Sequence, residues 1–303
     1  MKILVTGVNG QLGHDVMLEL ASRGLEPVGT DITPAYAGLL SDSPVAALPY
    51  SQLDLTDEKA VDRLLDELRP DAIIHCAAWT NVDAAEDIDN VPKVWAINAY
   101  ATLHLALACK ARAIRLMYIS TDYVFSGEGV EPWQPDCTDF LPRNVYGASK
   151  LGGELAVSTL LEQYFIVRIA WVFGRNGGNF VKTMLRLAET HDTLRVVCDQ
   201  IGTPTYTADL SRLLADMIAT DRYGVYHATN EGGFISWYDF AREIFRIAGK
   251  DVTVLPVTTA EYGVSKAKRP FNSRLDKSKL AQAGFEPLPD WRDALRRYIE
   301  EVT

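Results

Sequence analysis

The amino terminus combines a short apolar strand with a glycine-rich turn, and no other part of the chain constrains the fold as strongly. The run Lys2–Thr6 leads directly into Gly7–Gly13, which reads GVNGQLG and opens a predicted helix over Gln11–Ser22. In such a G-x-x-G-x-x-G pattern the glycines permit a tight turn, close approach of a pyrophosphate to the backbone, and close packing of helix on strand. The free N–H groups and the positive dipole end of the helix would face the phosphates. The sequence therefore predicts a dinucleotide-binding unit at the amino terminus.

An acidic residue, Asp31, follows the second predicted strand, Glu26–Thr30, about where such a unit needs one. A carboxylate there can accept hydrogen bonds from the adenosine ribose hydroxyls, which favours NADH over NADPH. Asp54, a little further along, has two open interpretations, because it can either reach the adenine or cap the helix that follows. The intervening stretch Thr33–Tyr50 contains three prolines, and we expect it to form a mobile loop near the adenine end.

Strands and helices alternate through most of the chain, which predicts an α/β fold with a doubly wound parallel sheet (Rossmann). The strand Ala72–His75 is apolar throughout, as expected for burial on both faces. After Trp171 the alternation breaks. We expect residues 1–170 to form the dinucleotide-binding domain and residues 171–303 mainly a smaller substrate-binding lobe, interleaved with the first domain. The other expected strands are Arg115–Ser120 and Tyr164–Ile169, and the other expected helices are Asp57–Leu68, Val91–Ala111, Tyr146–Gln163, Asn179–Thr190 and Trp291–Glu301.

Charge and composition exclude several classes of protein. The chain has 30 basic and 40 acidic residues, a net charge of −10 and no basic stripe, so we expect no nucleic-acid partner. It has no apolar run of membrane-spanning length, and its amino terminus is a strand and not a signal peptide. The cysteines lie far apart without metal-ligand spacing, so we expect reduced thiols, no metal site and a cytoplasmic location. They are Cys76, Cys109, Cys137 and Cys198.

Tyr146 and Lys150 form a Y-x-x-x-K pattern at the start of a predicted helix. Residues four apart lie on one helical face, so the two side chains would be neighbours. A lysine ammonium beside the phenol would lower its pKa from about 10 toward neutral pH. The phenol could then protonate a carbonyl oxygen as hydride reaches the carbon. By itself, the pattern fits a solvated surface pair equally well.

Two strand ends supply the context that the Y-x-x-x-K pattern needs. Ligands of parallel sheets bind at the carboxyl ends of the strands, and Thr121 and Asp122 follow the strand Arg115–Ser120. The Thr121 hydroxyl can hydrogen-bond a substrate oxygen there. The small residues Ala77 and Ala78, after the strand Ala72–His75, let a cofactor pass close to the backbone. The order of these features predicts a reductase site with Thr121, Tyr146 and Lys150 as catalytic residues.

This order of motifs resembles the extended short-chain dehydrogenase/reductases, and the resemblance extends from Gly7 to Ser273. Within that family, the chain is similar to the branch that reduces 4-keto sugars linked to dTDP. The segments that carry the resemblance are Gly10–Gly13, Ala77–Glu86, Ser120–Phe125, Asn144–Gly147, Arg168–Phe173, Asn179–Val181, Asp199–Thr205 and Arg269–Ser273.

The resemblance implies reduction of the C4 ketone of dTDP-4-dehydro-L-rhamnose to dTDP-L-rhamnose by hydride from NADPH or NADH. It implies that Tyr146 is the general acid, Thr121 its hydrogen-bonding partner and Lys150 the clamp on the nicotinamide ribose. Cofactor contacts are also expected from Gly7, Gly10, Gln11, Leu12, Gly13, Asp31, Asp54, Leu55, Ala77, Ala78 and Trp79. Contacts with the dTDP-linked 4-keto-6-deoxy sugar are expected from Thr121, Asp122, Tyr123, Trp171, Asn179 and Arg269.

Some of these assignments leave alternatives open. Asn179 and Arg269 are assigned to the substrate pyrophosphate, since a guanidinium binds phosphate oxygens bidentately, but Arg269 also fits a surface charge. Trp171 also fits core packing. The family tolerates both NADH and NADPH, and some of its members use Mg²⁺ in dimer assembly, for which we find no matching carboxylate cluster. No membrane partner is expected, and the assembly is a monomer or a homodimer.

Four other functions fit the same scaffold. A 4,6-dehydratase would carry Asp-Glu after the threonine, whereas Asp122 and Tyr123 follow Thr121 here. A nucleotide-sugar epimerase would recycle its cofactor, whereas a reductase consumes reduced cofactor stoichiometrically. Non-catalytic regulatory relatives tend to lose the Tyr–Lys pair, which this chain retains. A reductase with the opposite stereochemistry at C4 is also compatible with the sequence.

Overall fold

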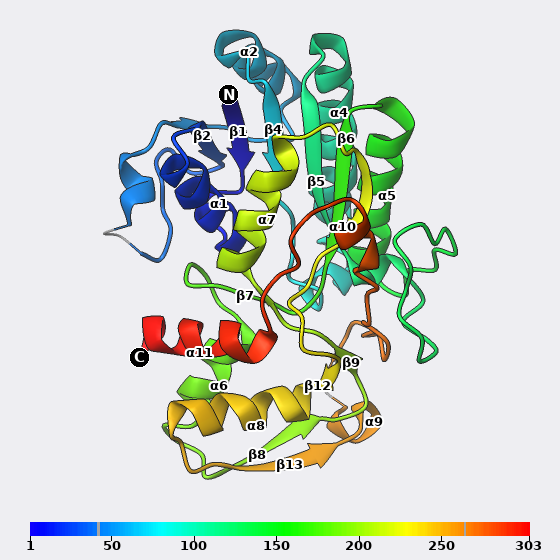
Figure 1. Ribbon diagram of the computed structural model, residues 1–303. Coiled ribbons are helices and arrows are strands. Elements are labelled where there is room, and N and C mark those ends of the chain that lie inside the picture. Colours follow the sequence, from blue (N-terminus) through cyan, green and yellow to red (C-terminus); the bar gives the residue numbers. More distant parts are fainter. Residues whose placement is uncertain (41–42, 264) are drawn as a thin grey trace.

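The computed structural model describes residues 1–40, 43–263 and 265–303, and its upper part in Figure 1 is a parallel sheet between two layers of helices. The seven strands follow the order β11-β6-β5-β4-β1-β2-β3, and every pair is parallel. The order reverses between β1 and β4, and ligands of such sheets bind at that crevice. The strands are β1 (Lys2–Thr6), β2 (Glu26–Asp31), β3 (Tyr50–Gln52), β4 (Ala72–His75), β5 (Arg115–Thr121), β6 (Tyr164–Ile169) and β11 (Gly224–His227).

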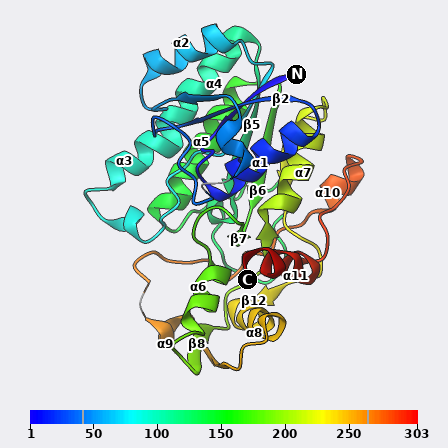
Figure 2. The same cartoon turned by 90° about the vertical axis from the view of Figure 1, so that its left-hand side faces the viewer.

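Successive residues of the central strands point to opposite faces of the sheet and build two separate cores. Ile3 and Val5 of β1 are fully buried in one core, and Leu4 between them is fully buried in the other. Figure 2 shows α1 and α7 on one side of the sheet and α2, α4 and α5 on the other. These helices are α1 (Gln11–Ser22), α7 (Thr207–Ile218), α2 (Glu58–Leu68), α4 (Ala101–Arg112) and α5 (Val145–Leu160). The doubly wound fold expected from the sequence is confirmed.

The predicted helix Val91–Ala111 is the main local difference. The chain forms α3 (Val91–Trp95), then a π-helical turn, η3 (Ala96–Tyr100), before it continues as α4. π-Turns inside α-helices often mark functional sites. Here the turn holds Asn98 in a buried position, where its side chain exchanges hydrogen bonds with the backbone of Trp79.

Two strands of the sheet, β3 and β11, are not among the strands whose bounds were expected from the sequence. The short strand β3 lies at the end of the stretch Thr33–Tyr50, of which residues 41–42 are outside the described part. The strand β11 lies in the last third of the chain and pairs with β6, and the preceding helix α7 packs on α1. Residues 207–227 therefore pack against the sheet and against a helix from the first part of the chain.

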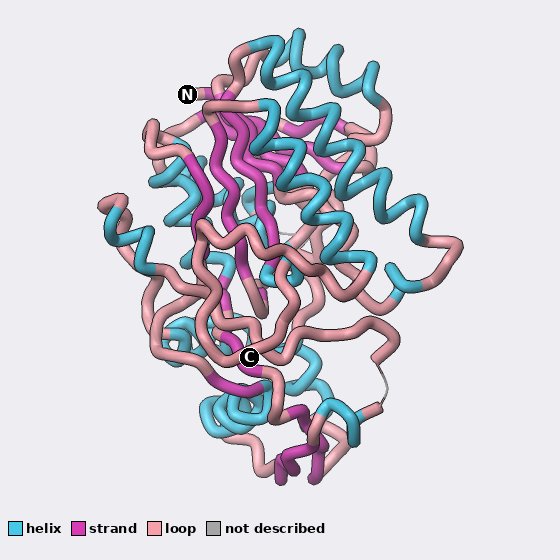
Figure 3. The backbone as a smooth tube through the Cα atoms, turned by 90° about the vertical axis from the view of Figure 1, so that its right-hand side faces the viewer, coloured by secondary structure: helices cyan, strands magenta, loops and turns pink. Residues whose placement is uncertain are grey.

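A smaller lobe lies below the carboxyl ends of the strands, as Figures 1 and 3 show. Its core is rich in aromatic side chains, including Phe173, Tyr206, Phe240, Trp291 and Tyr298. Its helices are α6 (Phe180–Leu187), α8 (Trp237–Ala248), α9 (Thr259–Tyr262) and α11 (Trp291–Val302), and α10 (Ser278–Gln282) lies beside β11. The short strand pairs are β7 (Val172–Phe173) with β10 (Thr205–Tyr206), β9 (Ile201–Gly202) with β12 (Ile235–Ser236), and β8 (Thr193–Val197) with β13 (Thr253–Val257).

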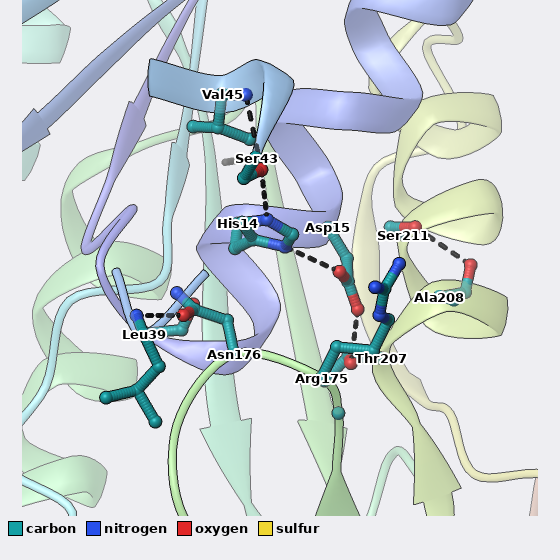
Figure 4. A network of polar contacts seen from close by, with 12 residues as sticks. His14, Asp15, Leu39, Ser43, Val45, Arg175, Asn176, Thr207, Ala208 and Ser211 are labelled. Carbon is teal, nitrogen blue, oxygen red and sulfur yellow. Dashed lines mark hydrogen bonds and ion pairs between the residues drawn. The ribbon is translucent and has the colours of Figure 1, made fainter. Parts of the chain in front are cut away.

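A buried polar network ties α1 to two distant segments (Figure 4). The His14 ring lies 2.8 Å from the Asp15 carboxylate through Nδ1 and 2.7 Å from the Ser43 hydroxyl through Nε2. Thr207, the first residue of α7, donates its hydroxyl hydrogen to the other Asp15 oxygen at 2.5 Å. The network joins α1, the segment before β3 and α7, so it fixes the layer on one face of the sheet.

Replacing Thr207 with valine is expected to lower the free energy of unfolding by about 1–3 kcal/mol. Valine has the same shape, so the change leaves a buried carboxylate short of one donor without opening a cavity. Urea unfolding followed by circular dichroism measures the difference. Thr190→Val, on an exposed loop, is the matched control, and equal stability of the two variants would contradict the importance of the network.

Asn176, which is distant in sequence from the glycine-rich turn, holds that turn through hydrogen bonds. Its side chain is fully buried, and its amide nitrogen donates to the carbonyl oxygens of Asn9 at 2.9 Å and Gly10 at 3.3 Å. Its amide oxygen accepts a hydrogen bond from the backbone of Leu39 at 2.6 Å (Figure 4). One side chain thus holds together the turn, the segment after β2 and the loop after β7.

Candidate active site

A cavity of about 810 Å³ lies at the carboxyl ends of β1, β4 and β5, beside the crevice that the strand order predicts. Its wall includes the glycine-rich turn, the ends of these strands, the first two turns of α5 and the segment Ile169–Val172. Its size is that of a cofactor or substrate site. The cavity therefore collects most of the residues that the sequence assigns to chemistry.

The glycine-rich turn is shaped for a ligand's phosphates. Gly7 has φ of +74°, and a Cβ on it would come within 2.7 Å of the Ala77 backbone. A Cβ on Gly13 would collide with the carbonyl oxygen of Gly7. No side chain in the described part of the chain caps the amino terminus of α1, so its N–H groups are available to an anion. The turn fits the pyrophosphate of a dinucleotide.

The far end of the cavity presents acids and hydroxyls suited to a ribose and a base. Asp31 ends β2, and its carboxylate accepts hydrogen bonds from the backbone N–H groups of Asn9 at 3.0 Å and Ile32 at 2.8 Å. Asp54 and Leu55 line the same end. Of the two interpretations of Asp54, helix capping is wrong, because Asp57 caps α2. The Thr30 hydroxyl there is buried and has no hydrogen-bond partner in the described structure.

The segment after β4 forms the middle of the wall. Ala77 and Ala78 line the cavity as expected, and the Ala77 N–H donates to the Thr6 hydroxyl at 3.1 Å. Trp79 is not among the lining residues, and its backbone is held by Asn98 instead. Asn98 also donates to the Ser149 hydroxyl at 3.0 Å, so it ties this segment to α5.

Tyr146 and Lys150 both face the cavity from α5. The helix begins after Asn144, whose side chain caps it by accepting from the Gly147 N–H at 2.7 Å. The Lys150 ammonium donates to the carbonyl oxygen of Ile119 at 2.7 Å. Burial lowers the pKa of Lys150 to about 7.

The expectation that Lys150 lowers the pKa of the Tyr146 phenol is wrong for this structure. Burial raises the pKa of Tyr146 above its usual value, the charge of Asp122 acts in the same direction, and the Thr121 hydroxyl opposes them. Desolvation of the phenolate outweighs any attraction to the ammonium, whose nearest acceptor is a backbone carbonyl. The phenol therefore keeps its proton at neutral pH, as a proton donor must before the reaction.

Thr121 and Asp122 form a buried pair at the end of β5. The Thr121 hydroxyl donates to one Asp122 carboxylate oxygen at 3.0 Å, and the Ser273 hydroxyl donates to the other at 2.5 Å. Burial raises the pKa of Asp122 to about 6. Asp122 borders the cavity, but both its oxygens already accept hydrogen bonds from protein hydroxyls. The Thr121 oxygen also accepts a hydrogen bond from the Tyr123 N–H at 3.3 Å, which ties the pair to the turn after β5.

The remaining substrate candidates lie at different distances from the cavity. Tyr123 lines it, with its ring edge-on to Tyr146 at 5.5 Å between centroids. Arg269 lies behind Tyr123, donating to its hydroxyl at 3.3 Å and to Asp83 at 2.7 Å, and it is not among the lining residues. Trp171 lines the cavity and also stacks on a lobe residue, so wall and packing roles coincide.

Asn179 lies elsewhere than expected. It caps α6, accepting from the Lys182 N–H at 3.0 Å. Its amide nitrogen lies within 3.0 Å of acceptors on Gln11, Gly174 and Tyr298, and Asn179 does not line the cavity. Asn179 therefore supports the side chain of Gln11, and its contact with a substrate pyrophosphate stays a prediction.

Sequence reasoning misses several residues that the fold brings to the site. Asn98 is a lone polar residue in an apolar helical pattern, and Ser273 closes a segment far along the chain; only a knowledge of their neighbours reveals their roles. Lys93 supplies a cation to the cavity wall although it reads as an ordinary surface lysine. The other unpredicted lining residues include Thr30, Ile32, Thr80, Val82, Ile97, Ile119 and Ser120.

The fold and the site define a nicotinamide-dependent oxidoreductase of the Rossmann type. The family model described as "RmlD substrate binding domain" matches residues 1–303, and the chain belongs to this family. It is similar to the dTDP-4-dehydrorhamnose reductase of Streptomyces griseus, with 42% identity over 96% of this chain and 91% of the relative. It is also similar to the spore coat polysaccharide biosynthesis protein SpsK of Bacillus subtilis, with 37% identity over 99% of this chain and 97% of that protein.

A solved structure agrees with these relatives. The dTDP-4-dehydrorhamnose reductase of Bacillus anthracis, in complex with NADP, superposes with a TM-score of 0.88 and 39% sequence identity. The match covers 99% of each chain. Among the described residues, no helix is long and apolar enough to cross a membrane, and no group of three or more His, Cys, Asp or Glu side chains is placed to hold a metal ion.

Proposed function

We propose that this chain reduces the C4 ketone of dTDP-4-dehydro-L-rhamnose to dTDP-L-rhamnose with NADPH or NADH. The observation that carries the proposal is the shared cavity, where Tyr146, Lys150 and Thr121 face the same space as the phosphate-binding turn. The names of the relatives from S. griseus and B. anthracis support the sugar substrate. The intact Tyr–Lys pair argues against a non-catalytic relative.

We assign different residues of the cavity wall to different parts of the nicotinamide cofactor. The turn Gly7–Gly13 binds the cofactor pyrophosphate through backbone N–H groups, and Asp31 binds the adenosine ribose. Ala77 and Ala78 form the floor beneath the cofactor, and Lys150 holds the nicotinamide ribose. When bound, the reduced nicotinamide supplies the hydride that reaches the ketone carbon.

The protein supplies the proton and the orientation of the ketone. Tyr146 donates its phenolic proton to the ketone oxygen, and its raised pKa keeps that proton in place until hydride transfer makes the oxygen basic. Thr121 is the hydrogen-bonding partner of the phenol: by donating to the phenolic oxygen it stabilises the phenolate left when the proton moves, and it leaves the single phenolic hydrogen for the ketone. Tyr123 and Trp171 form the wall against the sugar, and we assign Lys93 in the wall and Arg269 behind Tyr123 to the substrate pyrophosphate.

We infer that the two parts of the chain divide this work. Residues 1–170 hold the cofactor, residues 171–303 mainly form the substrate lobe, and the substrate binds between them. We further propose a cytoplasmic enzyme that acts as a monomer or a homodimer, two states that sedimentation equilibrium distinguishes.

A spectrophotometric assay tests the proposed reaction. Purified protein is mixed with NADPH or NADH and dTDP-4-dehydro-L-rhamnose, and the absorbance of the reduced nicotinamide is followed. We expect one equivalent of cofactor to be consumed per equivalent of dTDP-L-rhamnose formed. Conversion of the sugar without net consumption would indicate an epimerase or a dehydratase, and absence of any conversion would contradict the proposal.

Replacing Asp31 with alanine is expected to raise the KM for NADH about tenfold while raising that for NADPH less, because a hydrogen bond between a carboxylate and a ribose hydroxyl is lost. NADPH carries a phosphate at that hydroxyl, and the Asp31 carboxylate repels this phosphate. For NADPH, relief of the repulsion therefore offsets the lost hydrogen bond. Steady-state kinetics with each cofactor measures both values. Glu26→Ala, at the exposed opposite end of β2, is the control, and equal effects on the two cofactors would remove Asp31 from the ribose.

A further inference from the structure

Trp171 has a backbone conformation that is unusual for a bulky residue. Its φ is +52°, in the left-handed region. Arg69 and Ala113, the other described non-glycine residues with positive φ, each end a helix, whereas Trp171 lies between β6 and β7. Such strain persists only where the surroundings over-determine it, and it is common at ligand clamps. The contacts of the Trp171 indole should therefore explain why it is held there.

The C-terminal lobe holds the indole from two directions. Trp237, the first residue of α8, stacks on it with 3.7 Å between ring centroids and 15° between ring planes, and Phe180 packs on Trp237 at 4.6 Å. Gly202 lies at the edge of the indole, where a Cβ would come within 2.9 Å of the Trp171 Cε2 atom. The Trp171 carbonyl oxygen accepts a hydrogen bond from the Thr205 N–H at 3.1 Å. Ring and backbone are both fixed by the lobe.

Trp171 is also part of the cavity wall. Trp171 is half-buried and lines the cavity together with Tyr123 and Tyr146, at the end where the ketone is reduced. An indole presents a flat apolar surface that suits the C–H groups of a sugar ring. A 6-deoxy sugar carries a methyl group where other hexoses carry a hydroxymethyl group, so the edge of its ring that bears this group is more apolar.

We propose that Trp237 is a specificity-determining positioning residue, which holds the Trp171 indole in place as the wall against the 6-deoxy sugar ring. This inference rests on the proposed function and deepens it. Trp237 acts through Trp171 and need not touch the sugar. The wall recognises the sugar and not the nucleotide, so the two parts of the substrate respond differently when the stack is broken.

The test compares Trp237→Ala, which removes the stacking ring, with Trp237→Phe, which keeps a flat aromatic ring. We expect Trp237→Ala to raise the KM for the sugar nucleotide about tenfold, because stacking and buried aromatic contact are lost. Trp237→Phe should restore most of the affinity. The KM for NADPH should stay unchanged in both variants, which also shows that the first domain is folded.

Inhibition by dTDP, which lacks the sugar, identifies the part of the substrate that the wall contacts. We expect the inhibition constant of dTDP to be the same in Trp237→Ala and in the unmodified protein. An equal loss of affinity for dTDP and for the sugar nucleotide would place the base or the pyrophosphate against the wall and overturn the assignment to the sugar. An unchanged KM for the sugar nucleotide would overturn the role of Trp237.

A spectroscopic measurement tests the positioning role without turnover. The chain has six tryptophans, so ¹⁵N-labelled protein gives few indole N–H resonances, and Trp171→Phe assigns that of Trp171. In Trp237→Ala we expect the Trp171 resonance to move and broaden, and in Trp237→Phe to stay sharp. A sharp, unmoved resonance in Trp237→Ala would contradict the inference.

Matched controls separate this inference from the proposed function. Tyr238→Ala removes a half-buried aromatic ring from the next position of α8, away from Trp171, and should leave the KM for the sugar nucleotide unchanged. If the unmodified protein does not reduce the sugar at all, the proposed function fails. If the unmodified protein is active and Trp237→Ala matches it in KM and in spectrum, only the inference about Trp237 fails.

Discussion

Replacing Tyr146 with phenylalanine is expected to lower kcat about 100-fold or more, because the change removes the proton that the ketone oxygen receives. The aromatic ring remains, so packing against Tyr123 at 5.5 Å between centroids is preserved and the cofactor should bind as before. Steady-state kinetics at saturating concentrations of both substrates gives kcat, and fluorescence titration with NADPH gives the cofactor affinity.

The control for this change is Tyr164→Phe, which removes a hydroxyl from the amino end of β6, the end of the strand opposite the cavity. It should leave kcat unchanged. If Tyr146→Phe retained the kcat of the unmodified protein, another group would have to supply the proton, and the catalytic assignment would fail.

Replacing Glu154 with leucine is expected to lower the free energy of unfolding by about 3–5 kcal/mol, since it leaves the buried guanidinium of Arg168 without a counter-charge. Glu154 and Arg168 form a double hydrogen-bonded ion pair at 2.9 and 2.7 Å, and their side chains are only 4% and 2% exposed. Without the carboxylate, the hydrogen-bond neighbours of Arg168 within the described part of the chain are the carbonyl oxygen of Pro135 and the ring of His227. Urea unfolding measures the loss.

The double variant Glu154→Leu/Arg168→Met distinguishes a stranded charge from a lost contact. Two apolar side chains of similar size should recover most of the stability, because the guanidinium that lacked a partner is gone. If the double variant were no more stable than Glu154→Leu, the loss would come from packing around Glu154 and not from the charge on Arg168.

The sequence predicts the parts of this molecule that depend on local pattern. The turn at Gly7–Gly13 needs a positive φ at Gly7 and close contact between backbone segments, and the glycine pattern in the sequence predicts both. The pair Tyr146 and Lys150 needs only helical spacing. The apolar run Ala72–His75 predicts a strand buried on both faces. In each case the information lies within a few neighbouring residues.

The parts that the sequence does not predict depend on neighbours that are distant in the chain. The π-turn at Asn98 has no glycine or proline to mark it, and it becomes visible only when the backbone of Trp79 lies opposite. Asn179 resembles a residue that could bind a ligand, but its amide is used by the protein itself. The pKa of Tyr146 could not be inferred from Lys150 alone, because it depends on how completely the fold excludes water.

The bracing of the glycine-rich turn by Asn176 makes the two halves of the chain thermodynamically linked. Asn176 lies 167 positions after Asn9, in the loop that leads into the lobe, so the anion-binding backbone is finished only when that loop is in place. A ligand that binds the native turn stabilises everything needed to shape it. Saturation with dinucleotide should therefore protect amide hydrogens of the lobe from exchange, although the dinucleotide lies mainly on the other half.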